Sequence, residues 1–385
     1  PGGWLAGSVS AYSIGLAPLL WSQAVITEVY TLQAAFVSLA LFLSAAPPAR
    51  IPPRPLDYAR GLALGLGAGG HLTTLLLTPL LLVNAMRRGE REERGAPGRP
   101  RMDRRSLLRQ GAGLIAGLCI YLVLPLRAAA GAPVNWGNAV TLPRLWWLVS
   151  GKLYQEEVLR LGSPESWDRL RSAAALLLGQ FGLPAVILGF AGLLFFSSPS
   201  RLRLVTAWCA AAFTAFALGF GTFDSYVYLL PAFIAFAIWI GQGAAGMLRL
   251  NPRLGEAVCA LLLVSLFLRA GANWPQVDAS RDSEAERFGA RIMQEAPPDA
   301  ILFARGDRAV FTLWYFHFAL GQRRDLAVIA EDLLGFDWYL ETLRTTYPGL
   351  ALPRTVTPSS TIPVLNPERP ACDVDAGEQP SLNCP

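Results

Sequence analysis

Charge is scarce in this 385-residue sequence, and lysine and histidine are scarcer still. Asp, Glu, Lys and Arg make up 16% of the residues, whereas soluble globular proteins carry about 25%. Lys152 is the one lysine, and His71 and His317 are the two histidines. Hydrophobic residues reach 53% and the mean hydropathy is +0.37. This composition excludes a disordered protein, a nucleic-acid binder built on charge and an ordinary cytosolic enzyme, and it leaves a polytopic membrane protein with some water-soluble mass attached.

Short motifs that bind metals and nucleotides are missing too. The sequence has no CxxC pair, no HExxH, no Walker loop and no GxGxxG that opens a helix after a strand. We therefore predict no metal site and no cofactor, and any donor substrate would be lipid-linked or extracellular. Cys119, Cys209 and Cys259 lie in apolar runs and are typical of core residues. Cys372 and Cys384 lie in a polar segment and can pair if that segment faces an oxidising compartment.

Positive and negative charges are divided between the two parts of the sequence. Residues 1–270 have a net charge of +11, and residues 271–385 have a net charge of −6. We therefore predict a membrane domain over 1–270 and a separate soluble domain after it. The first apolar run begins at Trp4, with neither an initiator Met nor a basic segment before it. We expect from this that the sequence lacks the first spans of its protein.

Eight apolar runs come close to the ~20 residues that cross a bilayer. They cover residues 4–21, 31–46, 61–86, 110–128, 173–196, 204–221, 226–248 and 256–270. Arg-rich loops belong in the cytoplasm, and such loops lie at 47–60, 87–109, 197–203 and 249–255. A single crossing at 61–86 would put the first two of these loops on opposite sides of the membrane. We therefore predict about seven spans plus a broken-helix hairpin at 61–86, which turns near Gly69, Gly70 and His71 and has both ends in the cytoplasm.

This topology places loops 22–30, 129–172 and 222–225 outside the cytoplasm, together with everything after residue 271. In the long loop, Trp146 and Trp147, followed by Trp167, fit an interfacial belt or an amphipathic helix that lies on the membrane.

The C-terminal part alternates between strand-like and helix-like apolar stretches. We predict strands at 300–304 and 326–330, each followed by a helix, which favours a soluble α/β domain over 271–354. Residues 355–385 are rich in Pro and Ser and are predicted to be extended or disordered.

Three polar residues near the ends of apolar runs are candidates for ligand binding. Glu28 can orient an acceptor hydroxyl or a sugar, or it can simply favour a helix N-terminus behind a Thr27 cap. His71, at membrane depth, can donate a hydrogen bond to a lipid phosphate, or it can be a capping or packing residue. Arg127 can hold a phosphate, or its side chain can snorkel to the interface.

The predicted outer loops hold further candidates. Four of them suit contact with a sugar or a phosphate: Asn135, Trp136, Lys152 and Tyr154. The asparagine amide can form hydrogen bonds, the aromatic rings can stack on a sugar, and the lysine supplies one positive charge. Asp224 and Tyr226 occupy a short turn between two spans, where an Asp is either functional or a turn-former. Each of these residues is weak evidence when it is taken singly.

The order of the motifs is more specific than any one of them. The set comprises EVYTLQ at 28–33, GLALGLGAGGHLT at 61–73, LPLRA at 124–128, PVNWG at 133–137, KLY at 152–154, DSYVYLLP at 224–231, GD at 306–307, LWYF at 313–316, RRDLAVI at 323–329 and WY at 338–339. Over almost the whole chain this set resembles the family called domain of unknown function 2723, also known as transmembrane-protein-260-like or glycosyltransferase family 117.

The resemblance implies a GT-C fold, an α-helical polytopic membrane protein with a C-terminal extramembrane α/β domain. Such enzymes take a sugar from a polyprenyl-phosphate carrier at the outer or luminal face, and the eukaryotic relatives are protein O-mannosyltransferases. Implied here is an inverting transfer of a mannose-like sugar to a protein Ser or Thr or another hydroxyl acceptor, such as a glycan. The lipid-linked sugar would be a co-substrate, and no cofactor is implied.

The resemblance also distributes roles among the candidate residues. The general-base Asp of such enzymes lies in the first outer loop, which would precede Pro1. The donor phosphate would be bound by Arg127, His71 and Lys152. The sugar or the acceptor would be bound by Glu28, Asn135, Trp136, Tyr154, Asp224 and Tyr226.

Two other functions fit the same sequence. Broken helices are common in transporters, so a transporter or flippase for lipid-linked or small polar substrates is one alternative. The other is a non-catalytic membrane receptor or scaffold with the C-terminal part as its binding module. For the transferase we expect a membrane lipid-linked sugar donor and a protein or glycan acceptor as partners, and no nucleic acid. We expect a bacterial plasma membrane, with the C-terminal domain outside the cytoplasm.

Overall fold

The computed structural model describes residues 3–45, 52–89, 98–158, 165–196, 200–222, 224–356, 358–377 and 381–384. By their internal contacts they form two units. The helical unit comprises residues 1–120 and 153–279, and the mixed unit comprises residues 121–152 and 280–385. These units differ from the predicted division at 270. The helical unit extends to residue 279, and residues 121–152, which the prediction divided between the span 110–128 and the outer loop 129–172, pack with the C-terminal part.

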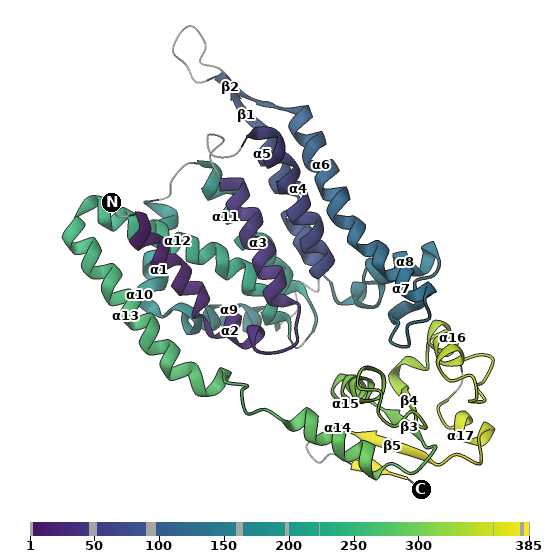
Figure 1. Ribbon diagram of the computed structural model, residues 1–385. Helices are drawn as coiled ribbons and strands as arrows, with labels where there is room; N and C mark the ends of the chain where they lie inside the picture. The colour runs from purple at the N-terminus through teal and green to yellow at the C-terminus, as the bar shows by residue number, and fades with distance from the viewer. Residues whose placement is uncertain are drawn as a thin grey trace. The chain divides into compact units, whose positions relative to one another are not determined.

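The helical unit is a bundle whose helices run up and down between two ends (Figure 1). Its helices are α1 (Gly3–Gly15), α2 (Pro18–Ala24), α3 (Tyr30–Ala45), α4 (Pro53–Gly70), η1 (Leu72–Leu77), α5 (Pro79–Ala85), α6 (Arg104–Leu118), α9 (Glu165–Phe181), α10 (Leu183–Leu194), α11 (Ser200–Gly219), η5 (Ser225–Leu229), α12 (Leu230–Leu250) and α13 (Pro252–Val277). A β-hairpin, β1 (Met86–Gly89) with β2 (Gly98–Met102), precedes α6. The short helix η4 (Lys152–Glu157) leads back into this unit.

Several of these helices are long and apolar enough to cross a membrane. Among the described residues four stretches meet that condition alone, namely Arg104–Ala129, Arg201–Gly219, Ser225–Leu250 and Pro252–Val277, and the number rises to six if each of two bent pairs is one span. The helix α3 is shorter, at 16 residues. The predicted class, a helical polytopic membrane protein with a C-terminal α/β part, is confirmed.

Two predicted spans are not straight helices. The run at 4–21 bends by 61° between α1 and α2, and the run at 173–196 bends by 103° between α9 and α10. The second bend lies at Gly182, whose φ of 76° is a conformation that glycine adopts without steric cost. Pro184 lies in the first turn of the next helix, α10, where proline is tolerated. The predicted span at 173–196 therefore consists of two helices joined by a sharp bend.

The chain from 61 to 86 contains a helix break at His71. The helix α4 ends at Gly70, His71 has an extended backbone, and η1 and α5 follow. The helix α5 ends beside the start of α6, because the Asp103 N–H donates to the Ala85 carbonyl at 2.8 Å. The first arm begins at Pro53 and has 18 residues, so it is longer than the predicted arm that begins at 61.

Glycines let α4 and α6 lie in close contact. A Cβ added at Gly61 would be 1.8 Å from the Gln110 carbonyl oxygen, and one added at Gly69 would be 2.4 Å from the Ile120 side chain. Gly61 thus meets residue 110 and Gly69 meets residue 120, so residue numbers rise in the same direction along both segments and α4 runs parallel to α6. Since α5 ends where α6 begins, α5 returns the chain to the end of the bundle at which α4 starts. Small residues at such positions are the usual way for membrane helices to pack closely.

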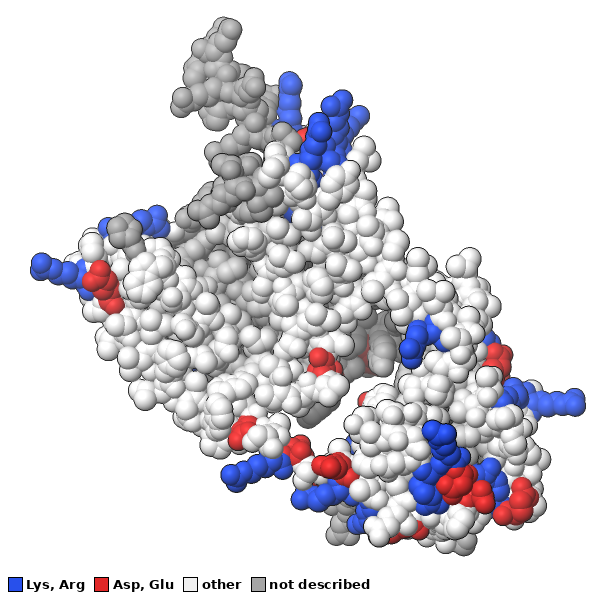
Figure 2. All heavy atoms as spheres, viewed as in Figure 1, with Lys and Arg blue, Asp and Glu red and all other residues white. Residues whose placement is uncertain are grey.

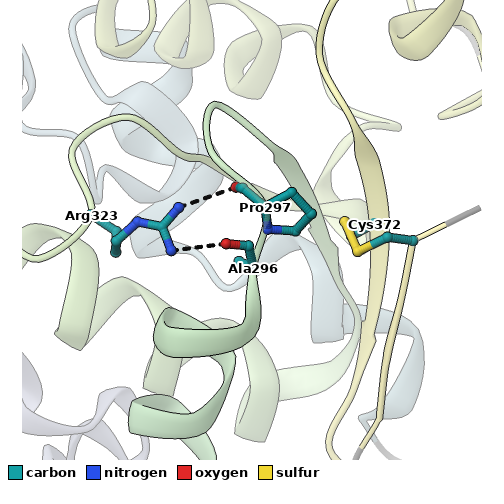
Figure 3. Close-up of a disulfide and its surroundings, with 5 residues drawn as sticks. Ala296, Pro297, Arg323 and Cys372 are labelled. Atoms are coloured by element: carbon teal, nitrogen blue, oxygen red, sulfur yellow. Dashed lines mark hydrogen bonds between the residues drawn. A yellow bond between two sulfur atoms is a disulfide. The ribbon is translucent and has the colours of Figure 1, made fainter.

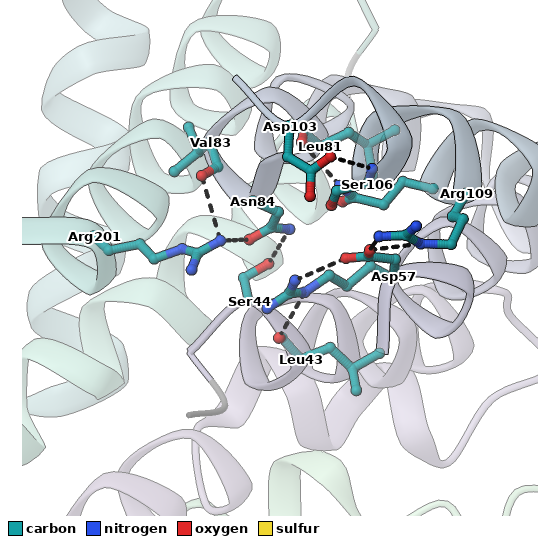
Figure 4. Close-up of polar contacts among 12 residues, drawn as sticks. Leu43, Ser44, Asp57, Leu81, Val83, Asn84, Asp103, Ser106, Arg109 and Arg201 are labelled. Atoms are coloured by element: carbon teal, nitrogen blue, oxygen red, sulfur yellow. Dashed lines mark hydrogen bonds and ion pairs between the residues drawn. The ribbon is translucent and has the colours of Figure 1, made fainter. Parts of the chain in front are cut away.

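A buried polar network ties the helices together at that end (Figure 4). Asp57 Oδ2 accepts hydrogen bonds from Arg109 Nε at 3.0 Å and Nη2 at 2.7 Å, and its Oδ1 faces Arg60 at 3.5 Å. Arg60 Nε also donates to the Leu43 carbonyl. Asp57 is 3% exposed. A buried carboxylate of this kind is tolerated because it is paired with cations and hydrogen-bonded.

The mixed unit contains a four-stranded sheet covered by helices (Figure 1). Its elements are α7 (Val123–Ala129), η3 (Trp136–Asn138), α8 (Leu142–Val149), α14 (Glu284–Glu295), β3 (Ile301–Ala304), α15 (Gly306–Trp314), η6 (Tyr315–Ala319), β4 (Ala327–Ala330), η7 (Glu331–Leu333), α16 (Asp337–Thr346), α17 (Thr361–Leu365), β5 (Ala371–Asp375) and β6 (Ser381–Asn383). The sheet order is β4-β3-β5-β6. Strand β3 is parallel to β4 and β5, and β6 is antiparallel to β5.

Strands β3 and β4 are buried at every position. Continuous apolar runs of this kind are typical of parallel strands covered on both faces, which is why both strands were visible in the sequence.

The segment 355–385, predicted to be extended or disordered, contains the short helix α17 and the strands β5 and β6 among its described residues. Strand β5 pairs in register with β3, with Ile301 opposite Ala371. Cys372 and Val374 point into the core while their neighbours are exposed. The prediction rested on the many Pro and Ser residues of this segment that precede β5. The alternating pattern of β5 itself is only five residues long and was missed.

Cys372 is joined to Cys384 by a disulfide (Figure 3). The same figure shows Arg323, which donates hydrogen bonds to the carbonyls of Ala296 and Pro297. The disulfide joins β5 to the residue that follows β6. The hydrogen bonds from Arg323 hold Ala296 and Pro297, which lead into β3.

Two tyrosines cover the outer edge of β4. The Val328 N–H donates to the Tyr347 hydroxyl at 3.0 Å, and the Ala330 N–H donates to the Tyr339 hydroxyl at 2.7 Å. Burial raises the pKa of both phenols. The hydroxyls therefore stay protonated and supply the hydrogen-bond partners that an edge strand otherwise lacks.

Candidate functional site

The two ends of the helical unit differ in chemistry. Basic side chains gather at the end where β1, β2 and α6 begin (Figure 2), including the exposed Arg101, Arg104 and Arg105. His71 lies at the other end of α4, 14 residues after Asp57, which is about 21 Å along a helix. The end that holds His71 is the one predicted to face away from the cytoplasm, because Arg-rich segments stay on the cytoplasmic side.

At the His71 end, three rings from three segments meet. The ring of Tyr30, in the first turn of α3, lies 5.6 Å from that of His71, and the ring of Tyr228, from η5, lies 5.3 Å from it. The two tyrosine rings are 5.8 Å apart. Tyr228 is buried, whereas His71 and Tyr30 are half-buried. The break at His71 is thus surrounded by the start of α3 and by the turn that opens α12.

A chain of hydrogen bonds sets which nitrogen of His71 carries the proton. Gln33 Nε2 donates to Thr73 Oγ1 at 2.6 Å, and Thr73 Oγ1 lies 2.8 Å from His71 Nδ1. The Thr73 backbone N–H also donates to Nδ1. A nitrogen that accepts from an N–H is not itself protonated, so Nδ1 is the acceptor and a neutral ring carries its hydrogen on Nε2. Among the described residues Nε2 has no protein partner, and it can donate to a ligand.

Two carboxylates lie near these rings. Glu28 and Asp224 interact electrostatically with the hydroxyls of both Tyr30 and Tyr228, and both acids are exposed. Asp224 precedes η5 but its side chain makes no capping bond. The helix α3 begins at Tyr30, three residues after Thr27, so the Thr27 cap that would explain Glu28 as a simple helix-terminus acid is not present.

The structure brings together four of the predicted site residues: Glu28, His71, Tyr154 and Asp224. Tyr154 belongs to η4 and acts electrostatically on Tyr228. Tyr226 lies on the same short helix as Tyr228, but its side chain is 45% exposed and is not among the rings that meet. We call the group formed by Glu28, Tyr30, His71, Asp224 and Tyr228 the broken-helix cluster.

The remaining predicted residues belong to the mixed unit. Arg127 is exposed in the last turn of α7, and Lys152 is exposed at the start of η4. Asn135 donates to Asn138 Oδ1 at 2.9 Å. The Trp136 ring packs 6.1 Å from that of Trp338, at the edge of the unit's core. The roles of these four residues toward donor or acceptor stay predictions.

Sequence reasoning missed Tyr30, Gln33 and Thr73. All three lie inside motifs that were quoted, EVYTLQ and GLALGLGAGGHLT, but an aromatic or polar residue at a helix start carries no sign of what it contacts. The bond between Gln33 and Thr73 spans 40 residues, and no local pattern indicates it. Among the described residues no three His, Cys, Asp or Glu side chains gather as a metal site would require.

The broken-helix cluster offers one neutral N–H donor, two phenols and two carboxylates beside a gap in a helix. The N–H and the phenols can bind an oxyanion, and the carboxylates can accept hydrogen bonds from hydroxyl groups. Such a set suits a ligand that is both phosphorylated and rich in hydroxyls.

Comparison with known proteins gives two matches to family models. Residues 3–94 match the protein O-mannosyl-transferase TMEM260 N-terminal domain, and residues 285–362 match TMEM260-associated domain 2. The mouse protein named "Protein O-mannosyl-transferase TMEM260" is 27% identical over 82 residues, which are 21% of this chain and 12% of the mouse protein. No solved structure matches the chain. The first model covers two parts of the broken-helix cluster, Glu28 to Tyr30 and His71, and the second covers most of the mixed unit's helices. With one model in each unit, the chain is similar to the TMEM260 family in both of its parts.

Proposed function

We propose that this protein is a membrane glycosyltransferase that moves a mannose-like sugar from a polyprenyl-phosphate donor to a hydroxyl group of a protein Ser or Thr. The family and the printed name of the mouse relative support the reaction class. The donor and acceptor are proposed on chemical grounds. A carrier held in a bilayer suits a site at the end of membrane helices, and the sequence contains no motif for a soluble nucleotide sugar.

The observation that carries the proposal is the broken-helix cluster. His71 presents Nε2–H at a helix break while its other nitrogen is fixed by Thr73. We assign this N–H to a phosphate oxygen of the donor, because a hydrogen bond to an anionic oxygen is stronger than one between neutral groups. Arg127 and Lys152 are proposed to add positive charge as the leaving phosphate develops its own charge.

The acceptor side of the cluster is assigned to Glu28 and Asp224. In the proposed reaction the acceptor oxygen forms a bond to C1 of the sugar, and the bond from C1 to the phosphate oxygen breaks. The hydroxyl proton passes to a carboxylate base, and the lipid phosphate leaves as an anion. An Asp upstream of Pro1 stays the predicted base, and we propose that Glu28 and Asp224 orient the sugar and the acceptor.

Transfer by the complete protein in proteoliposomes tests the assignment. His71→Ala should lower transfer at least tenfold, and His71→Gln should retain more activity because its amide can still donate. Thr73→Val should cause a smaller loss, since it frees the ring to change tautomer. Asp224→Asn should also lower transfer, while the matched exposed acid on α9, changed as Asp168→Asn, should not. Transfer by His71→Ala within twofold of the unmodified protein would overturn the phosphate assignment.

The arginine assignment has its own measurement. Arg127→Ala should reduce transfer at least tenfold if this guanidinium holds the donor phosphate, and a smaller loss would count against that role. Arg144→Ala is the matched control, because Arg144 pairs with Glu341 inside the mixed unit and has no assigned part in donor binding.

The helix break also supports transport as a second candidate function, because substrate sites of transporters are built at broken helices. Counterflow of a labelled lipid-linked sugar in proteoliposomes separates the two. Counterflow without formation of a glycosylated acceptor would favour transport, and glycosylation without counterflow would favour transfer.

A further inference from the structure

The helix α8 of the mixed unit carries large apolar side chains on its outer face. Leu142 is 81% exposed and Trp146, four residues later, is 72% exposed. Residues four apart lie on the same side of a helix, so these two side chains form one continuous apolar surface. Pro143, which follows Leu142 in the chain, is exposed as well.

The opposite face of α8 packs against the hydrophobic core of the mixed unit. The Trp147 ring lies 5.9 Å from Phe336 and 6.3 Å from Trp338. Arg144 donates two hydrogen bonds to the Glu341 carboxylate, at 2.7 and 2.8 Å. The adjacent tryptophans, 146 and 147, therefore point in different directions, one outward and one into the protein. A helix fixed on one side in this way presents its other side in a constant orientation.

The helix α8 follows a candidate membrane span in the chain. The helix α7 completes the candidate membrane span Arg104–Ala129, and its Leu126 side chain is 69% exposed. The end of α7 and the approach to α8 line one hollow of the mixed unit, since Ala128, Ala129 and Val140 share it. The helix α8 thus begins 13 residues after the candidate span ends at Ala129, and the two ends share this hollow.

We propose that α8 lies in the membrane interface next to the end of this span and holds the mixed unit against the bilayer through Leu142 and Trp146. Tryptophan favours this depth because its ring is apolar while its N–H can reach water or lipid headgroups. A short helix that is held by protein on one face and exposes an apolar face on the other can lie in the interface plane with the exposed face in the lipid. Arg144 and Trp147 connect the lipid-bound helix to α16, so the contact with lipid also orients the unit.

Fluorescent labelling of the complete protein in vesicles tests this proposal. In a background that carries Cys119→Ser, Leu142→Cys and Trp146→Cys are labelled separately with an environment-sensitive dye. Cys209 and Cys259 are buried and Cys372 is in the disulfide, so the introduced thiol is the reactive one among the described cysteines. The matched control is Glu286→Cys, at an exposed position of the polar face of α14.

The expected result is quenching by a nitroxide lipid at both α8 positions that is at least twofold stronger than at position 286, with weaker quenching by iodide. Strong iodide quenching at Leu142→Cys and Trp146→Cys would show a surface in water and overturn the proposal. Protection from both quenchers would show a protein surface over α8 and would overturn it equally.

A second comparison uses the two neighbouring tryptophans. Trp146→Ala should leave the thermal stability unchanged and reduce quenching at position 142 by lipid nitroxide, while Trp147→Ala should lower stability. Equal loss of stability in the two variants would show that Trp146 is a core residue. None of these measurements depends on sugar transfer. The lipid-contact proposal can therefore be refuted while the transferase proposal stands, and the transferase proposal can be refuted while the lipid contact stands.

Discussion

Replacing Asp57 by Asn should destabilise the helical unit more than any exposed acid replacement. Asp57 accepts two hydrogen bonds from Arg109 and faces Arg60, and Arg60 is itself only 6% exposed. The Asn side chain is nearly the same size, so packing is retained while the negative charge is lost. The buried guanidinium of Arg60 and the half-buried guanidinium of Arg109 are then left without their counter-charge.

The cost follows from the burial of these groups. Removing one partner of a buried ion pair costs about 3–5 kcal/mol, because the remaining charge stays desolvated. For a unit of this size 1 kcal/mol corresponds to about 2–4 °C in Tm, so we expect a decrease of roughly 6–20 °C. The control, Asp168→Asn, breaks a pair with Arg171 whose side chains are 77% and 80% exposed. Exposed pairs contribute about 0–1 kcal/mol, so its Tm should hardly change.

A thiol-reactive dye measures the transition directly. Cys209 and Cys259 are buried in the helical unit, and each becomes reactive when the bundle opens, with exposed Cys119 replaced by Ser to lower the baseline. A Tm for Asp57→Asn within 2 °C of the Asp168→Asn control would refute the reasoning, because the network would then contribute no more than a surface pair. Adding Arg109→Gln to Asp57→Asn should cost less than the sum of the two single changes, since one change already breaks their bond.

Three further predictions concern packing, the disulfide and pH. Gly113→Ala should lower Tm in the same dye assay because its Cβ would lie 2.3 Å from the Tyr58 carbonyl oxygen, whereas Gly111→Ala, with nothing within 4 Å, should leave Tm unchanged or raise it. Cys384→Ser should lower the stability of the mixed unit by about 3 kcal/mol, as expected for a loop of 12 residues, and an unchanged denaturation midpoint without reductant would contradict this. Hydrogen bonds from Arg323 lower the pKa of Asp325 to about 2, below the ~3.9 of an unfolded chain; this stabilisation is present above pH ~4 and is lost as the pH falls toward 2. Asp325→Asn should therefore make the midpoint less sensitive to pH between 4 and 2, and an identical pH profile would count against the ion pair.

Much of the fold could be predicted because its signals are local. The apolar runs that became α3, α11, α12 and α13 are visible in composition alone. The break at His71 could be expected from the Gly-Gly pair before it and from the Arg-rich loops on both sides. The two strands β3 and β4 are short continuous apolar runs, which turn residues delimit.

The features that were missed depend on distant contacts or on weak local signals. Residues 121–152 pack with the C-terminal part through pairs such as Arg144 with Glu341, which are 197 residues apart. Strand β5 shows only two buried positions, Cys372 and Val374, in a segment of mostly polar composition. The bend at Gly182 was readable in principle, because a glycine followed two residues later by a proline interrupts an otherwise uniform apolar run.

The candidate site was predicted less completely than the fold. The residue types at Glu28, His71 and Asp224 suggested chemistry, and the structure places them at one end of one unit. Which tyrosine of the DSYVYLLP motif faces His71 depends on the winding of η5, and Tyr228 rather than Tyr226 does so. The proton position on His71 depends on Thr73 and Gln33, whose contact no sequence pattern encodes.

The tyrosine hydroxyls along β4 limit how this unit can meet another polypeptide. An open strand edge invites any extended chain to add itself by main-chain pairing, which is tolerant of sequence and a common start of aggregation. Tyr339 and Tyr347 occupy the N–H groups at which such pairing would begin. Another polypeptide would have to displace one buried phenol, Tyr339, and one half-buried phenol, Tyr347, before its first backbone hydrogen bond formed. Recognition of a polypeptide at this edge must therefore use side chains, and a unit closed in this way can stay near other unfolded chains without becoming part of their aggregates.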